Sequence, residues 1–157
     1  MASENNESTY VSTPEQDWEK TSAYAATRDL LITFTIGKTG LIPKPAQLRF
    51  AMALILQHDV SCVAATGFGK SLAFQMAMFL LGGKFGIVVT PLNRLGQDQV
   101  EKCKKIGIRA VLLNAETQQK QANIISKIYQ GEFDLGMYIA ITHEHYINNW
   151  VYSLCRT

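Results

Sequence analysis

The stretch Ala64-Ala65-Thr66-Gly67-Phe68-Gly69-Lys70-Ser71 decides the fold that this sequence predicts. It follows an apolar run over residues 59–63 and leads directly into residues 72–81, whose composition predicts a helix. Gly67 and Gly69 allow the backbone to curl so that successive N–H groups face one anion, and the helix adds the positive end of its dipole. This order of strand, glycine-rich turn and helix is typical of a phosphate-binding loop.

The polar residues of the loop each have a task in such a site. The Lys70 ammonium group can reach the β- and γ-phosphates of a nucleotide, and the Ser71 hydroxyl can ligate Mg²⁺. The alternative is an ordinary strand–turn–helix with a surface lysine, and Ala64 stands where the usual pattern has glycine. The complete context favours a site for a nucleotide and Mg²⁺ formed by Thr66, Gly67, Phe68, Gly69, Lys70 and Ser71. With the adenine reader described below, the nucleotide is expected to be ATP.

Outward from the loop, apolar runs alternate with helical patterns. After a helix that begins at Pro45 and ends near Gln57, four strands alternate with four helices. The strands are expected over residues 60–65, 86–90, 109–113 and 135–141, and the helices over residues 71–81, 92–106, 117–130 and 144–154. Such apolar strands predict an α/β fold, a parallel sheet with helices on both faces. Ligands of these sheets bind beyond the carboxyl ends of the strands, where the loop falls.

The residues before this pattern predict a separate N-terminal part. Residues 1–12 are polar and are expected to be disordered. Thr13 and Pro14 have the residue types of a helix start, and the helix is expected to run to about Phe34 before residues 37–40 end it. We therefore divide the chain into a disordered start, a helical segment with a linker over 13–43, and a nucleotide-binding domain over 44–157.

Length and composition set limits on the class of protein. The 157 residues are expected to form one domain with a core of its own. Residues 1–36 hold six acids and two bases, whereas the remainder holds thirteen bases and seven acids. A basic body fits phosphate-bearing partners, although a solvated lysine face explains it equally well. Three cysteines without CxxC pairing, no signal peptide and no span long enough for a membrane predict an intracellular protein.

Three further motifs surround the loop. Gln47 lies 23 residues before Lys70 and could present its amide to an adenine edge; the alternative is a surface glutamine in a helix that begins with proline. Thr90 and Asn93 stand where a strand gives way to a helix and can donate to phosphate oxygens; the alternative is ordinary strand–helix punctuation. His143-Glu144-His145 lacks metal-site spacing, and we expect it to start a helix.

Taken together, these motifs resemble the RecQ family of superfamily 2 DNA helicases over about residues 44–147. The resemblance is carried by Pro45-x-Gln47, by Ala65-Thr-Gly-Phe-Gly-Lys-Ser-Leu-Ala-Phe-Gln75, by Val88-Val-Thr-Pro-Leu92, by Asp98-Gln-Val100, by Leu113-Asn-Ala115 and by Tyr138-Ile-Ala140. It implies the first RecA-like domain of a 3′–5′ DNA helicase that is nuclear in a eukaryote. It also implies that Gln47 reads adenine, Thr66–Ser71 hold the phosphates, and Thr90, Asn93 and Arg94 follow single-stranded DNA, with RNA as a possible substitute.

Some residues depart from the family pattern. Phe68 replaces a small residue, Thr142 stands where the family has proline, and no DExH box lies within the 157 residues. We therefore expect a chain that binds nucleotide but hydrolyses it poorly, because that box supplies a Mg²⁺ ligand and positions the attacking water. Two interpretations stay open: part of an ATP-dependent helicase, or a catalytically inactive module that binds nucleotide or nucleic acid. A small P-loop kinase is a third, which Pro45-x-Gln47 disfavours. The oligomeric state is open.

Overall fold

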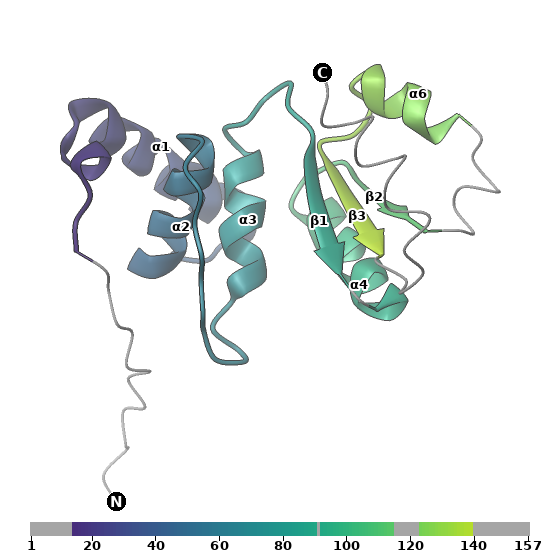
Figure 1. Ribbon diagram of the computed structural model, residues 1–157, viewed down its shortest axis with the longest axis horizontal. Helices are drawn as coiled ribbons and strands as arrows, with labels where there is room; N and C mark the ends of the chain where they lie inside the picture. The colour runs from purple at the N-terminus through teal and green to yellow at the C-terminus, as the bar shows by residue number, and fades with distance from the viewer. Residues whose placement is uncertain (1–13, 91, 115–122, 140–157) are drawn as a thin grey trace, which may run out of the picture. The chain divides into compact units, whose positions relative to one another are not determined.

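The computed structural model describes residues 14–90, 92–114 and 123–139 of the chain (Figure 1). The chain divides into two compact units, residues 1–82 and residues 83–157, where its length predicted one domain. Each unit is described by itself below. Within the described ranges, no helix combines the length and the apolar composition that a bilayer crossing requires.

The first unit is helical. It contains the 3₁₀ helix η1 (Asp17–Lys20) and the helices α1 (Ser22–Thr39), α2 (Pro45–Ile55) and α3 (Lys70–Met78). The Thr21 side chain caps the start of α1 by accepting from the N–H of Tyr24. The helix runs past the predicted end near Phe34 and stops at Gly40, whose φ of 71° is left-handed and whose N–H donates to Ile36 O at 2.8 Å.

The core of this unit lies where the three α-helices meet. Leu31 of α1 packs with Ala51 and Met52 of α2 and with Met76 and Ala77 of α3, and all five are fully buried. The two alanines leave room for the helix backbones to approach one another, and the long side chains fill the remaining space. The helices α2 and α3 confirm the two helices that the sequence predicts from Pro45 to near Gln57 and over residues 71–81.

The strand predicted over residues 60–65 is wrong. Residues 58–65 form no strand, and their apolar side chains are poorly covered: Val63 is 97% exposed and Val60 is 37% exposed. A strand is stabilised by backbone hydrogen bonds to a neighbouring strand. The described residues of this unit contain helices and loops but no strand, so they offer the segment no strand with which to pair.

The second unit contains a three-stranded parallel sheet. Its elements are β1 (Gly86–Thr90), α4 (Asn93–Lys105), β2 (Ala110–Leu113), α6 (Ile124–Tyr129) and β3 (Leu135–Ile139). The strand order is β1-β3-β2, and Leu135 of β3 pairs with both Gly86 and Ala110. The strands and α4 confirm the predicted positions. Predicted features over residues 1–12, 117–122 and 140–157 lie outside the described residues.

The order of the strands bears on how the helices cover this sheet. The connection from β1 to β2 crosses over β3 in one direction, and the connection from β2 to β3 returns in the other. Right-handed crossovers would then place α4 and α6 on opposite faces, so helices on both faces stay a prediction. Ile124 and Ile128 of α6 pack with Val111 and Leu113, which project from the same face of β2.

Within each unit, one ion pair ties together segments that are distant in the sequence. In the second unit, Arg109 before β2 donates from its backbone N–H to Asp134 Oδ2 at 2.9 Å and from its guanidinium to both carboxylate oxygens. These hydrogen bonds lower the pKa of Asp134 more than partial burial raises it. In the first unit, Arg49 of α2 donates to Glu19 Oε2 and to Pro14 O, both at 2.7 Å, and so ties η1 to α2.

The Glu19 carboxylate gives the first unit a pH-dependent stability. Burial raises the pKa of Glu19, but hydrogen bonds from Arg49 and from the N–H of Gln16, with the charge of Arg49, outweigh it, so the pKa is lowered overall. A carboxyl group with a lowered pKa stabilises the fold above the range in which it titrates when unfolded. That contribution is lost as the pH falls through the lowered folded pKa.

We therefore expect Glu19→Gln to lower the free energy of unfolding at pH 7 by about 1–2 kcal/mol, because a charge-assisted contact is lost. The variant should also lose less stability than the wild type when the pH is lowered from about 6 to about 3. Urea unfolding followed by circular dichroism at several pH values measures both. Glu15→Gln, which removes an exposed carboxylate nearby, is the control. Parallel pH curves for the wild type and Glu19→Gln would contradict the assignment.

Candidate functional site

The loop before α3 contains two glycines in the left-handed conformation. Gly67 and Gly69 both have a φ of 85°, in the left-handed region that favours glycine. The N–H of Phe68 donates to Ala65 O at 3.3 Å, which closes a turn, and Gly69 is the N-cap of α3. The loop therefore ends on the positive end of the helix dipole, and Lys70 and Ser71 lie in the first turn.

The Gln47 side chain joins α2 to this loop. Its Nε2 donates to Phe68 O at 2.9 Å and to Gly69 O at 3.1 Å, and its Oε1 accepts from the N–H of Lys44 at 2.8 Å. Gln47 is only 4% exposed. Both amide protons and the amide oxygen of this buried group are thus satisfied within the protein. The contact to the loop spans 21 and 22 residues of sequence.

These contacts bear on the adenine-reading role predicted for Gln47. An amide reads an adenine edge with one donor and one acceptor, and in this structure both donors face loop carbonyls. Gln47 would have to exchange a loop carbonyl for the base. The role stays a prediction, and the structural role of Gln47 in holding the loop is the one observed. The Pro-x-Gln start of α2 drew attention to Gln47 in the sequence. It did not reveal that the partners of the side chain are the carbonyls of Phe68 and Gly69.

Lys70 contacts the loop itself. Its Nζ donates to Ala64 O at 2.7 Å and to Ala65 O at 2.9 Å, and the side chain is exposed. The ammonium group therefore contacts the carbonyl groups at the start of the loop. The N–H groups that begin α3 lie at the other end of the same loop. A phosphate oxygen is a stronger partner for an ammonium group than a neutral carbonyl oxygen, because both members of the pair are then charged.

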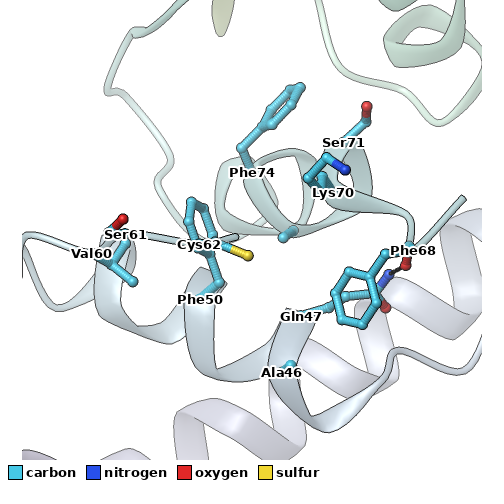
Figure 2. A pocket seen from close by; sticks show the side chains of 11 residues that line it. Ala46, Gln47, Phe50, Val60, Ser61, Cys62, Phe68, Lys70, Ser71 and Phe74 are labelled. Atoms are coloured by element: carbon cyan, nitrogen blue, oxygen red, sulfur yellow. Dashed lines mark hydrogen bonds between the residues drawn. The ribbon is translucent and has the colours of Figure 1, made fainter. Parts of the chain in front are cut away.

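A pocket of about 420 Å³ lies beside the loop, between α2, α3 and the segment over residues 60–62 (Figure 2). Three aromatic side chains line it, together with the polar groups of the loop; they include Gln47, Phe50, Phe68, Lys70, Ser71 and Phe74. Phe68 is half-buried, and Lys44 Nζ lies 4.8 Å from its ring centroid, within the range of a cation–π contact. The size and lining suit a small ligand with a flat apolar part and a charged part.

The residues beside the pocket can be tested for their fit to Mg²⁺. The described residues contain no cluster of three or more histidine, cysteine or acidic side chains that could enclose a metal ion. Ser71 supplies a hydroxyl oxygen in the first turn of α3. Mg²⁺ is commonly held by one or two protein oxygens, with water and substrate phosphates completing its octahedron. A single hydroxyl next to a phosphate loop fits that mode of binding.

The residues predicted to follow nucleic acid belong to the second unit. Asn93 and Arg94 are exposed at the start of α4, whereas Thr90 at the end of β1 is only 5% exposed. Within the described residues, Thr90 Oγ1 has no hydrogen-bond partner. Asn93 Oδ1 accepts from Nδ2 of Asn114, a buried residue after β2 that the sequence analysis did not assign to the site. Two signals were available: its place in Leu113-Asn-Ala115, one of the motifs that carry the resemblance, and its position after a strand at the same sheet edge.

The two loop glycines allow a matched test of the contact with Gln47. A Cβ at residue 69 would lie 2.5 Å from Gln47 Nε2, whereas a Cβ at residue 67 meets no atom within 4 Å. Both positions have the same φ, so alanine at either costs about 1 kcal/mol of backbone strain. We expect Gly69→Ala to lower the free energy of unfolding by about 1–3 kcal/mol more than Gly67→Ala, because the buried amide loses its acceptors. Equal losses in urea unfolding would contradict this.

Comparison with known proteins adds a family to this geometry. The model of the DEAD/DEAH box helicase family matches residues 44–149. The chain is similar to a putative ATP-dependent DNA helicase Q1 of Caenorhabditis briggsae, with 33% identity over 93 residues, or 59% of this chain and 15% of the relative. It is also similar to ATP-dependent DNA helicase RecQ of Haemophilus influenzae, with 35% identity over 79 residues, or 50% of this chain and 13% of the relative.

A plant relative shows the same relationship. ATP-dependent DNA helicase Q-like 2 of Arabidopsis thaliana is 37% identical over 90 residues, which cover 57% of this chain and 13% of the relative. The chain thus spans only a small part of the length of the curated relatives it matches. The resemblance to RecQ helicases that the motifs indicated is confirmed. Because the family match covers most of the sequence and contains the whole glycine-rich loop, this chain belongs to the DEAD/DEAH box helicase family.

Proposed function

We propose that the chain is the ATP-binding portion of an ATP-dependent DNA helicase of the RecQ type. It binds ATP with Mg²⁺ at the loop over residues 66–71 and single-stranded DNA, in a 3′–5′ motor, at Thr90, Asn93 and Arg94. Membership of the DEAD/DEAH box family implies a RecA-like P-loop fold. The observation that carries the proposal is the loop itself: two left-handed glycines, a lysine on the loop carbonyls and a helix start beside one pocket.

ATP binding then follows from an exchange of partners. The Lys70 ammonium group leaves the carbonyls of Ala64 and Ala65 for the β- and γ-phosphate oxygens, and the N–H groups at the start of α3 face the same anion. The Ser71 hydroxyl would hold Mg²⁺, which supplies positive charge to the phosphates when bound. The base is accommodated by the aromatic pocket, with Gln47 turning one amide proton from the loop toward adenine.

We expect Lys70→Ala to weaken ATP binding by about 2–3 kcal/mol, or roughly thirty- to one-hundred-and-fiftyfold, because a charge-assisted contact is lost. Lys38→Ala is the matched control, since Lys38 is another exposed lysine of the same unit whose Nζ contacts the Phe79 ring instead. Isothermal titration calorimetry with ATP and Mg²⁺ measures both. Equal affinity in the wild type and Lys70→Ala would refute the assignment of the loop.

The proposed contact with DNA rests on the start of α4. The first N–H groups of this helix lack helical acceptors, and Asn93 and Arg94 add an exposed amide and an exposed guanidinium beside them. These groups suit phosphate oxygens, so the contact is expected to show no sequence preference. The preference for DNA rests on the relatives, which are named as DNA helicases.

We expect Arg94→Ala to weaken binding of oligothymidine at low salt and to reduce the slope of log affinity against log salt by about one. Lys102→Ala, which removes an exposed cation in the last turn of the same helix, should have a smaller effect. Fluorescence anisotropy with a labelled oligothymidine over a series of salt concentrations gives both quantities. An unchanged slope for Arg94→Ala would place the DNA contact elsewhere.

A further inference from the structure

Asn114 makes a long-range contact to the start of α4. Its Nδ2 donates to Asn93 Oδ1 at 3.1 Å, across 21 residues of sequence. Asn114 follows the last residue of β2 and is 8% exposed, whereas Asn93 is the exposed first residue of α4. A buried residue that follows β2 thus contacts the exposed start of the helix that follows β1, although β3 lies between these two strands in the sheet. The arrows of Figure 1 show β1 and β3 pointing to the same edge of the sheet.

The contact determines which way the Asn93 amide faces. An asparagine side chain carries an acceptor oxygen and a donor NH₂ group on opposite branches of one plane. Because Oδ1 of Asn93 accepts from the buried Asn114, its NH₂ group is turned away from Asn114 and is available to a ligand. A phosphate accepts hydrogen bonds and does not donate them, so this is the orientation that suits a phosphate. The reverse orientation would present an oxygen and repel it.

A second observation points to a ligand at the same strand-to-helix connection. Thr90 Oγ1, on the last residue of β1, is buried and has no hydrogen-bond partner in the part of the chain that the structure describes. An unsatisfied buried hydroxyl costs free energy that an acceptor would recover. The connection thus carries three kinds of donor: the hydroxyl of Thr90, the amide of Asn93 and the first N–H groups of α4.

We propose that Asn114 is a positioning residue for nucleic-acid binding, which acts by holding the NH₂ group of Asn93 toward a phosphate of the backbone. Asn114 itself does not contact the nucleic acid. The inference rests on the proposed DNA contact at Thr90, Asn93 and Arg94 and adds to it the residue that orients one donor. It differs from a purely structural role, in which Asn114 would only fasten the start of α4 to the end of β2.

A double-mutant cycle tests whether Asn114 acts on binding through Asn93. Binding of a fluorescein-labelled oligothymidine at low salt is measured by anisotropy for the wild type, Asn93→Ala, Asn114→Ala and the double variant. We expect each single variant to bind about fivefold more weakly, as for one hydrogen bond to a charged group, and the double variant to bind no more weakly than Asn93→Ala. Multiplied effects, about twenty-five-fold in the double variant, would overturn the positioning role.

A spectroscopic readout follows the same contact directly. In ¹H–¹⁵N spectra, titration with the oligothymidine should shift the side-chain amide signals of Asn93 in the wild type, and Asn114→Ala should abolish or reduce that shift. Gln99→Ala is the matched control, because Gln99 is a buried polar residue of α4 further from its start. This control should lower stability but leave the Asn93 shift in place. A shift of Asn93 that is unchanged in Asn114→Ala would overturn the inference.

The outcomes also distinguish the inference from the proposed function. If the wild type does not bind the oligothymidine at low salt, or Arg94→Ala binds as tightly as the wild type, the DNA contact itself is refuted and the inference with it. If Arg94→Ala weakens binding but Asn93→Ala does not, only the positioning role is refuted. Asn93 is exposed, so Asn93→Ala tests whether its NH₂ group contributes to binding, which the inference requires, even if Asn114→Ala does not fold.

Discussion

The first unit depends on the three hydrogen bonds of the Gln47 amide. A buried amide must be satisfied, and Gln47 meets this requirement by joining the start of α2 to the carbonyls of Phe68 and Gly69. These bonds hold the loop, which leads directly into α3, against the start of α2. They also leave no room for a Cβ at residue 69, so glycine is required there for its φ and for the close approach of the amide.

The hydrogen bonds of Gln47 and Lys70 to the loop keep both side chains ordered when no ligand is bound. Lys70 and Gln47 are each satisfied by neutral carbonyls of the loop, so a ligand does not have to order them; it has to offer better acceptors. For the ammonium group of Lys70, a phosphate is such an acceptor. For Gln47, a neutral acceptor on an adenine edge would only replace the neutral loop carbonyl that the amide proton leaves. We therefore propose that the phosphates of a bound nucleotide would contribute most of the affinity and the base would contribute selectivity.

In the second unit, the two ends of the sheet have different tasks. Arg109 and Asp134 stand where β2 and β3 begin, and their ion pair holds the two strands together. Thr90 and Asn114 stand where β1 and β2 end, and Asn114 donates to Asn93; these are the polar groups for which we propose a nucleic-acid contact. This division follows from the parallel sheet, because its carboxyl ends all meet one edge and the following helices present their N–H groups there.

The sequence by itself determined the features that depend on neighbouring residues. The glycines of the loop, the proline start of α2, the helices α3 and α4 and the strands β1 to β3 could be predicted, because backbone conformation and hydrophobic periodicity are local properties. Only the tertiary structure decided whether residues 60–65 form a strand, which partners satisfy Gln47, and that Asn114 contacts Asn93. Each of these depends on a partner more than 20 residues away or on a neighbouring strand, and no local pattern specifies such a partner.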